Sequence, residues 1–348
     1  MHLVVLAPQP LDTLEQEVRS RFAAIADHDL SRPEIDTPLA LPGQLPARLR
    51  VKTHESRQRV EFLFPITDPI DDYADKPDAY VANLLGHEGE GSLLAALRRQ
   101  GWADGLSAGT READGRHALF DVSISLTAEG VAHLDQIQAS LFAQIQRLRD
   151  RGVDTWRYRE QADLAQQSFR FQQRQEPIQT VSNLAMSLAY YPLADVQYAP
   201  YRMDRFDPAA ITALLDRLTP DNLLRVYSGP EVEGDHTTTY FGAPYTLTRV
   251  SQWPEAQPLD DLGLPESNPY IADDLSVETF PAAAPERLVD TPSVELWHQA
   301  DSDFGAPRVE WRFSLQSPQA ASDARHAVLT RLLAGWLNDG LNERFYPA

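Results

Sequence analysis

Apolar residues recur along the chain with two periods, and these predict both strands and helices. Residues 118–126 are apolar at every second position, which predicts a strand with one buried face. The next apolar residues recur every three or four positions, as on one face of a long helix. They are Leu134, Ile137, Leu141, Ile145 and Leu148. Thr127, between the two segments, is a predicted N-cap for that helix.

The same reading assigns further elements on both sides of this pair. Strands are predicted at 3–6, 59–64, 223–228 and 309–315. Helices are predicted after Asp12 or Thr13, and at 80–85, 92–100, 156–175, 178–189, 208–218 and 320–345. Gly101 follows one helix at the position where glycine often ends helices. The elements from about residue 59 onwards read as an α+β unit.

Two proline-rich stretches, at about 31–47 and 230–292, read as linkers. A single strand and helix precede the first stretch, and a single strand and helix follow the second. Neither pair can bury its own apolar faces, so we expect both to be parts of neighbouring domains.

Charge and composition narrow the classes of partner. The chain has 51 acidic and 31 basic residues, a formal net charge of −20. Such a surface repels phosphate backbones and anionic lipids, so neither nucleic acid nor membrane is an expected partner. It favours cationic or amphipathic peptides, but simple solubility is the more ordinary explanation of the charge. No stretch approaches the roughly 20 apolar residues that span a bilayer.

The sequence offers no recognisable catalytic or metal site. It contains no cysteine, which excludes disulfides and thiolate chemistry and suits an oxidising compartment. The nine histidines include no H-E-x-x-H or H-x-x-E-H pair, because His54-Glu55 and His87-Glu88 both lack a second histidine in register. We therefore predict no catalytic residue, no metal ligand and no cofactor in this segment.

One loop is unusual. Three glycines fall within six residues of the stretch 86–91, which then enters a predicted helix. Glycines let another chain approach the backbone closely. A helix N-terminus attracts negative charge, but two glutamates in the loop oppose phosphate binding. A purely structural turn between helices is the alternative interpretation.

This loop and its surroundings resemble the second domain of the insulinase/pitrilysin family of zinc metalloproteases. The matching segments occur in the family's order along the whole chain. They are F-P at 64–65, Y-A-D-K-P at 73–77, G-H-E-G-E-G-S-L-L at 86–94, G-W-A at 101–103, L-S-A-G at 106–109, L-T-A-E-G at 126–130, F-R-F at 169–171, Y-Y-P-L at 190–193, L-T-P-D-N at 218–222 and Y-F-G-A-P-Y at 240–245.

The resemblance implies an insulinase/pitrilysin-like α+β domain, with an antiparallel-rich sheet packed by helices and partial flanking domains. The expected ranges are 1–35 for the end of the zinc-bearing first domain, 36–56 for a linker, 57–250 for the non-catalytic second domain, 251–291 for a second linker and 292–348 for the start of a third domain. The resemblance also implies that the family's zinc motif would precede Met1 and that its catalytic arginine and tyrosine would follow Ala348. We therefore expect a fragment of a longer metalloendopeptidase that needs zinc, and we expect this segment alone to be inactive.

The resemblance also implies a function for this segment. In the family, the second domain carries an exosite that anchors the N-terminus of a peptide substrate away from the zinc, within a closed chamber. Its positions correspond here to His87, Glu88, Gly89, Glu90, Gly91, Leu106, Ala108 and Gly109. The family often has two glycines where this chain has Ala108 and Gly109, which could hinder the peptide slightly.

Peptide substrates and the remaining domains of the parent are thus the expected partners, and a bacterial periplasm the expected compartment, with cytoplasm as the alternative. A stand-alone, catalytically inactive peptide-binding or scaffold protein of the same family remains the alternative function.

Overall fold

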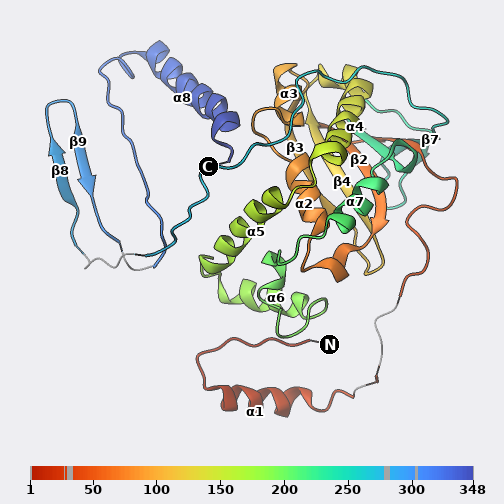
Figure 1. The fold of residues 1–348 in the computed structure, drawn as a ribbon, viewed down its shortest axis with the longest axis horizontal. Coiled ribbons are helices and arrows are strands. Elements are labelled where there is room, and N and C mark those ends of the chain that lie inside the picture. Colours follow the sequence, from red (N-terminus) through yellow and green to blue (C-terminus); the bar gives the residue numbers. More distant parts are fainter. Residues whose placement is uncertain (1, 27, 30–33, 278–282, 302–304, 348) are drawn as a thin grey trace. The chain divides into compact units, whose positions relative to one another are not determined.

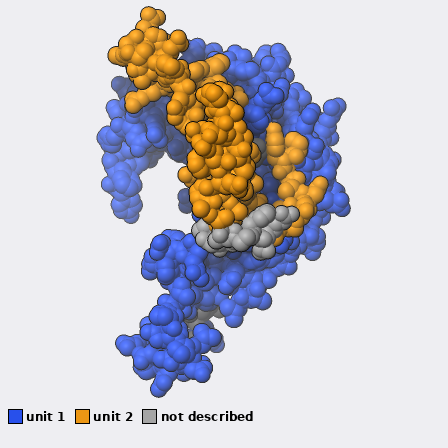
Figure 2. Space-filling model, turned by 90° about the vertical axis from the view of Figure 1, so that its left-hand side faces the viewer, with its two compact units in different colours: residues 1–268, 342–347 blue, residues 269–341, 348 orange. Residues whose placement is uncertain are grey.

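The computed structural model describes the chain from 2 to 347 except 27, 30–33, 278–282 and 302–304 (Figure 1). The described residues form two compact units, which Figure 2 distinguishes by colour. The first comprises 1–268 and 342–347, and the second is formed mainly by 269–341. The first unit contains the buried core and the candidate site.

A seven-stranded sheet dominates the first unit. Its spatial order is β3 (Ala103–Arg111), β4 (His117–Leu126), β2 (Gln58–Thr67), β5 (Leu224–Gly229), β1 (Ala47–Lys52), β7 (Pro244–Arg249) and β6 (His236–Thr237). Only β1 and β5 run parallel, and every other pair of neighbours is antiparallel. The antiparallel-rich sheet of the predicted fold class is confirmed.

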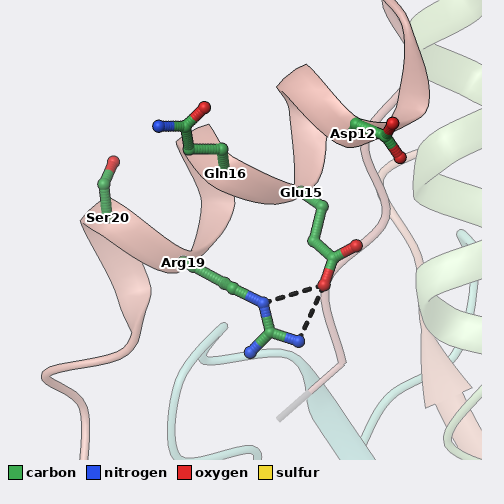
Figure 3. A pocket seen from close by; sticks show the side chains of 5 residues that line it. All are labelled: Asp12, Glu15, Gln16, Arg19 and Ser20. Carbon is green, nitrogen blue, oxygen red and sulfur yellow. Dashed lines mark hydrogen bonds and ion pairs between the residues drawn. The ribbon is translucent and has the colours of Figure 1, made fainter.

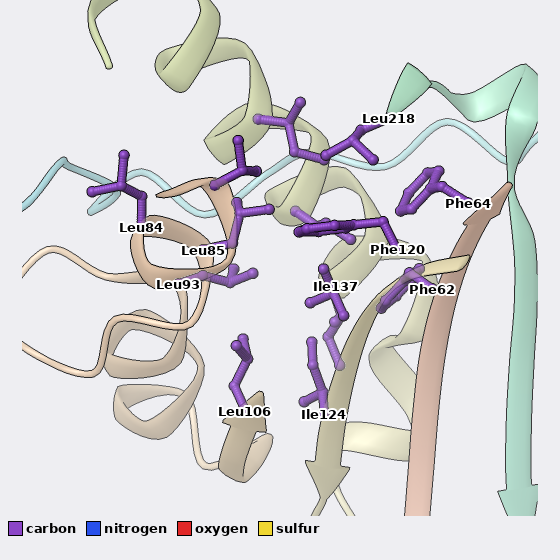
Figure 4. Packing of buried hydrophobic residues seen from close by; sticks show 14 of the residues in the cluster. Phe62, Phe64, Leu84, Leu85, Leu93, Leu106, Phe120, Ile124, Ile137 and Leu218 are labelled. Atoms are coloured by element: carbon purple, nitrogen blue, oxygen red, sulfur yellow. The ribbon is translucent and has the colours of Figure 1, made fainter. Parts of the chain in front are cut away.

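Seven of the helices are α1 (Leu11–Phe22), α2 (Pro77–Leu85), α3 (Leu93–Arg99), α4 (Leu134–Arg151), α5 (Thr155–Arg170), α6 (Pro177–Ser187) and α7 (Pro208–Arg217). Residues of α2, α3, α4 and α7 form one apolar cluster with β2 and β4. Figure 4 shows Phe62 and Phe120 from the strands meeting Ile137 and Leu85 from the helices. Alternation in the strands and helical spacing in α4 both direct apolar side chains into this cluster.

Local signals explain several helix ends. The Ser92 hydroxyl accepts a hydrogen bond from the Ala95 amide at 3.1 Å and caps α3. Gly101 has a φ of +72°, as expected for the glycine that ends this helix. Thr127 accepts from the Gly130 amide at 3.1 Å. The predicted N-cap role of Thr127 for the long helix is nevertheless wrong, because a short 3₁₀ helix, Gly130–His133, intervenes and His133 is the N-cap of α4.

The structure differs from the predicted elements mainly near the linkers. Residues 3–6 form no strand. The stretch 36–56, expected as a linker, contains β1, which lies between β5 and β7. The proline-rich stretch at about 230–292, also read as a linker, contains β6 and β7. These strands are short, and β1 and β7 pair with each other across about 200 residues, so their own sequences carry little local signal.

The second unit contains β8 (Glu286–Asp290), β9 (Glu295–His298) and most of α8 (Ala324–Phe345). None of its described residues is buried. The predicted strand 309–315 is not formed. Its alternating apolar residues, Val309, Trp311, Phe313 and Leu315, are each at least 66% exposed. The expected domain boundaries remain predictions.

Candidate peptide-anchoring site

Strand β3 lies at one edge of the sheet. Among the described strands it pairs only with β4, so its outer edge is free. Ala108 lies opposite Val122, and Gly109 lies opposite Asp121. A strand with one free edge can accept an extended peptide as an additional strand.

The glycine loop begins next to this strand. A side chain at Gly86, the first residue of the loop 86–91, would place its Cβ 3.6 Å from the Ala108 amide nitrogen. The fold therefore brings the start of the loop against the middle of β3. Helix α2 makes this approach possible, because it packs on β3 and ends at Leu85, with Gly86 as its C-cap.

His87 has a defined orientation within the loop. Its Nδ1 accepts a hydrogen bond from the Gly89 amide at 3.0 Å, and its ring meets the edge of Tyr346 with centroids 4.7 Å apart. Burial lowers the pKa of His87, so the ring is neutral at pH 7 with its proton on Nε2. A Cβ at Gly89 would lie 2.5 Å from the His87 ring, which explains the glycine.

The two glutamates of the loop differ in availability. Glu88 is half-buried and forms an ion pair with Arg98 at 3.0 Å. Its carboxylate also accepts from Asn342 at 3.3 Å. Glu90 is exposed and makes no hydrogen bond or ion pair to another described residue. Of the two, Glu90 is therefore the carboxylate available to a ligand cation.

Gly91 faces a different segment. Its φ is +77°, and its carbonyl oxygen accepts from the Gly263 amide at 2.7 Å. Gly263 belongs to residues 251–268, here called the strap, which packs on α3, α4 and α5. The buried Gln144 donates to the Gly263 carbonyl at 2.6 Å. Gly91 is thus needed for its backbone conformation and for this close approach, not for space beside β3.

The three predicted residues on β3 have distinct environments. Leu106 is only 9% exposed and belongs to the apolar core. Ala108 is partly buried against the same core. A Cβ at Gly109 would meet no atom within 4 Å, so only this position has open space beside it. Leu106 therefore supports the strand, and Gly109 leaves room on it.

A charged cluster beside Gly109 was not predicted. Arg111 lies 3.1 Å from Glu61 and 3.5 Å from Asp121, on three adjacent strands. Alternation in β2 and β4 places Glu61 and Asp121 on the face opposite the core. That pattern was the available signal, but only the strand register shows that the three residues meet.

A hollow elsewhere on the described surface gives no better site. It lies on α1 and is lined by Asp12, Glu15, Gln16, Arg19 and Ser20 (Figure 3). All five residues are exposed and belong to a single helix, and the Glu15–Arg19 ion pair of 2.7 Å connects adjacent turns. Such a hollow encloses no ligand.

The described residues offer neither a metal site nor a membrane-spanning helix. No group of three or more histidine, aspartate or glutamate side chains there is arranged to hold a metal ion. Among the described helices, none combines the length and apolar character needed to cross a membrane.

Comparison with known proteins identifies the family. Residues 1–163 match the model described as the peptidase M16 inactive domain. Residues 169–348 match the model described as the middle or third domain of peptidase M16. The chain therefore belongs to the peptidase M16 family, as the resemblance to insulinase and pitrilysin predicted.

Individual relatives support the assignment to the peptidase M16 family. The chain is 29% identical over 358 residues to the insulin-degrading enzyme of Drosophila melanogaster, covering all of this chain and 36% of the relative. It is 30% identical over 358 residues to that of Homo sapiens, covering 35% of the relative. The crystal structure of pitrilysin superposes with a TM-score of 0.80 at 25% identity, covering 98% of this chain and 38% of that one. The chain thus spans about a third of the length of these relatives.

Proposed function

We propose that this chain is the substrate-holding segment of a zinc-dependent metalloendopeptidase that degrades peptides in a closed chamber. In this proposal the segment performs no catalysis. It anchors the N-terminus of the peptide at β3 and the adjoining glycine loop. Support comes from the match of its first half to a peptidase M16 inactive domain and from relatives named as insulin-degrading enzymes.

The free edge of β3 is the observation that carries the proposal. The strand presents unpaired backbone groups next to Gly109, where a side chain would meet no atom. A peptide aligned on this edge gains backbone hydrogen bonds whatever its sequence. That property suits the holding of varied peptides.

Backbone pairing contributes more to this binding than the loop acids do. An exposed ion pair is worth at most about 1 kcal/mol, and Glu88 is already paired with Arg98. Several backbone hydrogen bonds at about 1 kcal/mol each exceed that contribution. Glu90 supplies an additional attraction for the peptide's ammonium group.

The experiment measures peptide affinity by fluorescence anisotropy for the wild-type chain and for Gly109→Val. The branched side chain fills the open space on the face of β3, where the neighbouring side chain of a paired peptide would lie, so we expect binding at least about tenfold weaker, a loss of about 1.4 kcal/mol. The matched control is Thr248→Val, which places the same side chain at an exposed position of β7. Unchanged affinity in a folded Gly109→Val variant contradicts the proposal.

A further inference from the structure

The cluster of Glu61, Arg111 and Asp121 lies beside the free strand, on the side of the sheet opposite the core. The guanidinium of Arg111 contacts both carboxylates, at 3.1 Å and 3.5 Å. Only 14% of each acidic side chain is exposed, against 39% for Arg111. With all three residues ionised, the cluster carries two negative charges and one positive, a net charge of −1.

Asp121 lies at the middle of the cluster, where the Nε of Arg111 is also buried without a hydrogen-bond partner. By register it lies on β4 between Leu63 of β2 and Gly109 of β3. Its Oδ1 is shielded from solvent and has no hydrogen-bond partner. The charged groups that act on it are Arg111, Glu61 and Arg59. Burial is the main reason why the pKa of Asp121 is raised to about 6.

Gly109 connects this cluster to the peptide. Residues opposite each other on paired antiparallel strands project to the same face, so the open space at Gly109 adjoins the Asp121 side chain. A peptide on β3 would place its nearest group in that space. The charge of Asp121 therefore acts directly on whatever group the peptide places there.

We propose that Asp121 makes peptide anchoring pH-dependent by holding a cationic group of the peptide over Gly109 when ionised and releasing it when protonated. The cation is an alkylammonium or guanidinium group, from either the peptide's N-terminus or a lysine or arginine side chain. This inference rests on the proposed anchoring function. It adds a charge preference and a pH range to that function.

The test compares three peptides of equal length between pH 5 and pH 7. One has a free N-terminus and no basic side chain, one is N-acetylated with a single lysine, and one is N-acetylated and neutral. We expect the affinity of at least one cationic peptide for the wild-type chain to rise about fivefold across this range. The neutral peptide should show no such rise, and the cationic peptide that responds identifies the source of the charge.

Asp121→Asn is the matched variant, because it keeps the shape and removes the titration. We expect it to bind all three peptides with affinities independent of pH. His87 is present in both proteins, so any contribution from its own protonation cancels in the comparison. A wild-type profile that matches the Asp121→Asn profile overturns the inference.

A direct titration separates this inference from the proposed function. Carboxyl carbon chemical shifts, measured by NMR in the wild-type chain, should give Asp121 a midpoint near pH 6. A midpoint near 4 overturns the inference even if every peptide binds. If no peptide binds at any pH, the anchoring function fails, and the inference fails with it.

Discussion

Glycines in this chain differ in whether the fold leaves room for a side chain, and substituting them by alanine measures that difference. A Cβ at Gly130 would lie 1.9 Å from the Trp102 carbonyl oxygen, whereas a Cβ at Gly109 meets no atom within 4 Å. We expect Gly130→Ala to lower the free energy of unfolding by about 3 kcal/mol, because the backbone must move. Gly109→Ala should change it by less than about 0.5 kcal/mol. Urea unfolding measures both, and equal effects would refute this explanation.

Asp121 also gives a prediction for stability. Its pKa rises from 3.8 to about 6 on folding, so the fold favours the protonated carboxyl. The raised pKa therefore contributes to the free energy of unfolding in full below pH 3.8, and this contribution is lost as the pH rises through about 6. The stability of Asp121→Asn relative to wild type should therefore increase between pH 4.5 and pH 7. A constant difference in Tm across that range would show that the carboxyl titrates normally.

For single residues, the sequence predicted the place in the secondary structure better than the tertiary partner. Gly101 as a helix end followed from its place after an apolar helical segment. The ion pair between Glu88 and Arg98 could not be predicted from a loop that had no known orientation. The same holds for Gly91, whose partner Gly263 is distant in sequence. Such contacts depend on the tertiary structure, and local sequence patterns carry no information about it.

Among the elements, those with strong periodicity were predicted and those stabilised by distant partners were missed. Strand β4 and helix α4 bury continuous apolar faces, so their patterns were clear. Strand β1 is short and carries Arg48 and Arg50, but it pairs on both sides within the sheet. Its stability comes from β5 and β7, which a reading of residues 47–52 alone cannot supply.

The strap provides a test of packing in a segment that was expected to be a linker. Leu262 is 7% exposed and belongs to the core cluster. Leu262→Ala should lower the free energy of unfolding by about 2–3 kcal/mol, because it leaves a cavity. Amide exchange at 259–265 should also become faster. The exposed Asp260 is the control position, and Asp260→Ala should cost less than about 0.5 kcal/mol. Equal effects of the two substitutions would indicate a loose segment.

For the whole molecule, the family could be predicted because its motifs occur in order along the entire chain. The antiparallel sheet and its helical cover agree with that prediction. The second unit was predicted less well, since the strand pattern at 309–315 has no partner strand among the described residues. Apolar alternation identifies a strand only where another strand is present to pair with it.

Zinc content tests the proposal that this segment is non-catalytic and that another part of the parent protease binds the zinc. The chain has no paired-histidine zinc motif and no cysteine, so we expect well under one zinc per chain after dialysis, and no peptidase activity. Elemental analysis and a peptide cleavage assay measure these quantities. One tightly held zinc per chain, or cleavage that a chelator abolishes, would contradict this division.

The most direct measurement of the central claim locates a bound peptide on the chain. A peptide with a photoreactive group at its second residue is bound and irradiated, and the linked residues are identified by mass spectrometry. Anchoring at the strand edge predicts links within 86–91 and 105–111, and their loss in Gly109→Val. Links concentrated on α5 and α6, with β3 unlabelled, would contradict the account.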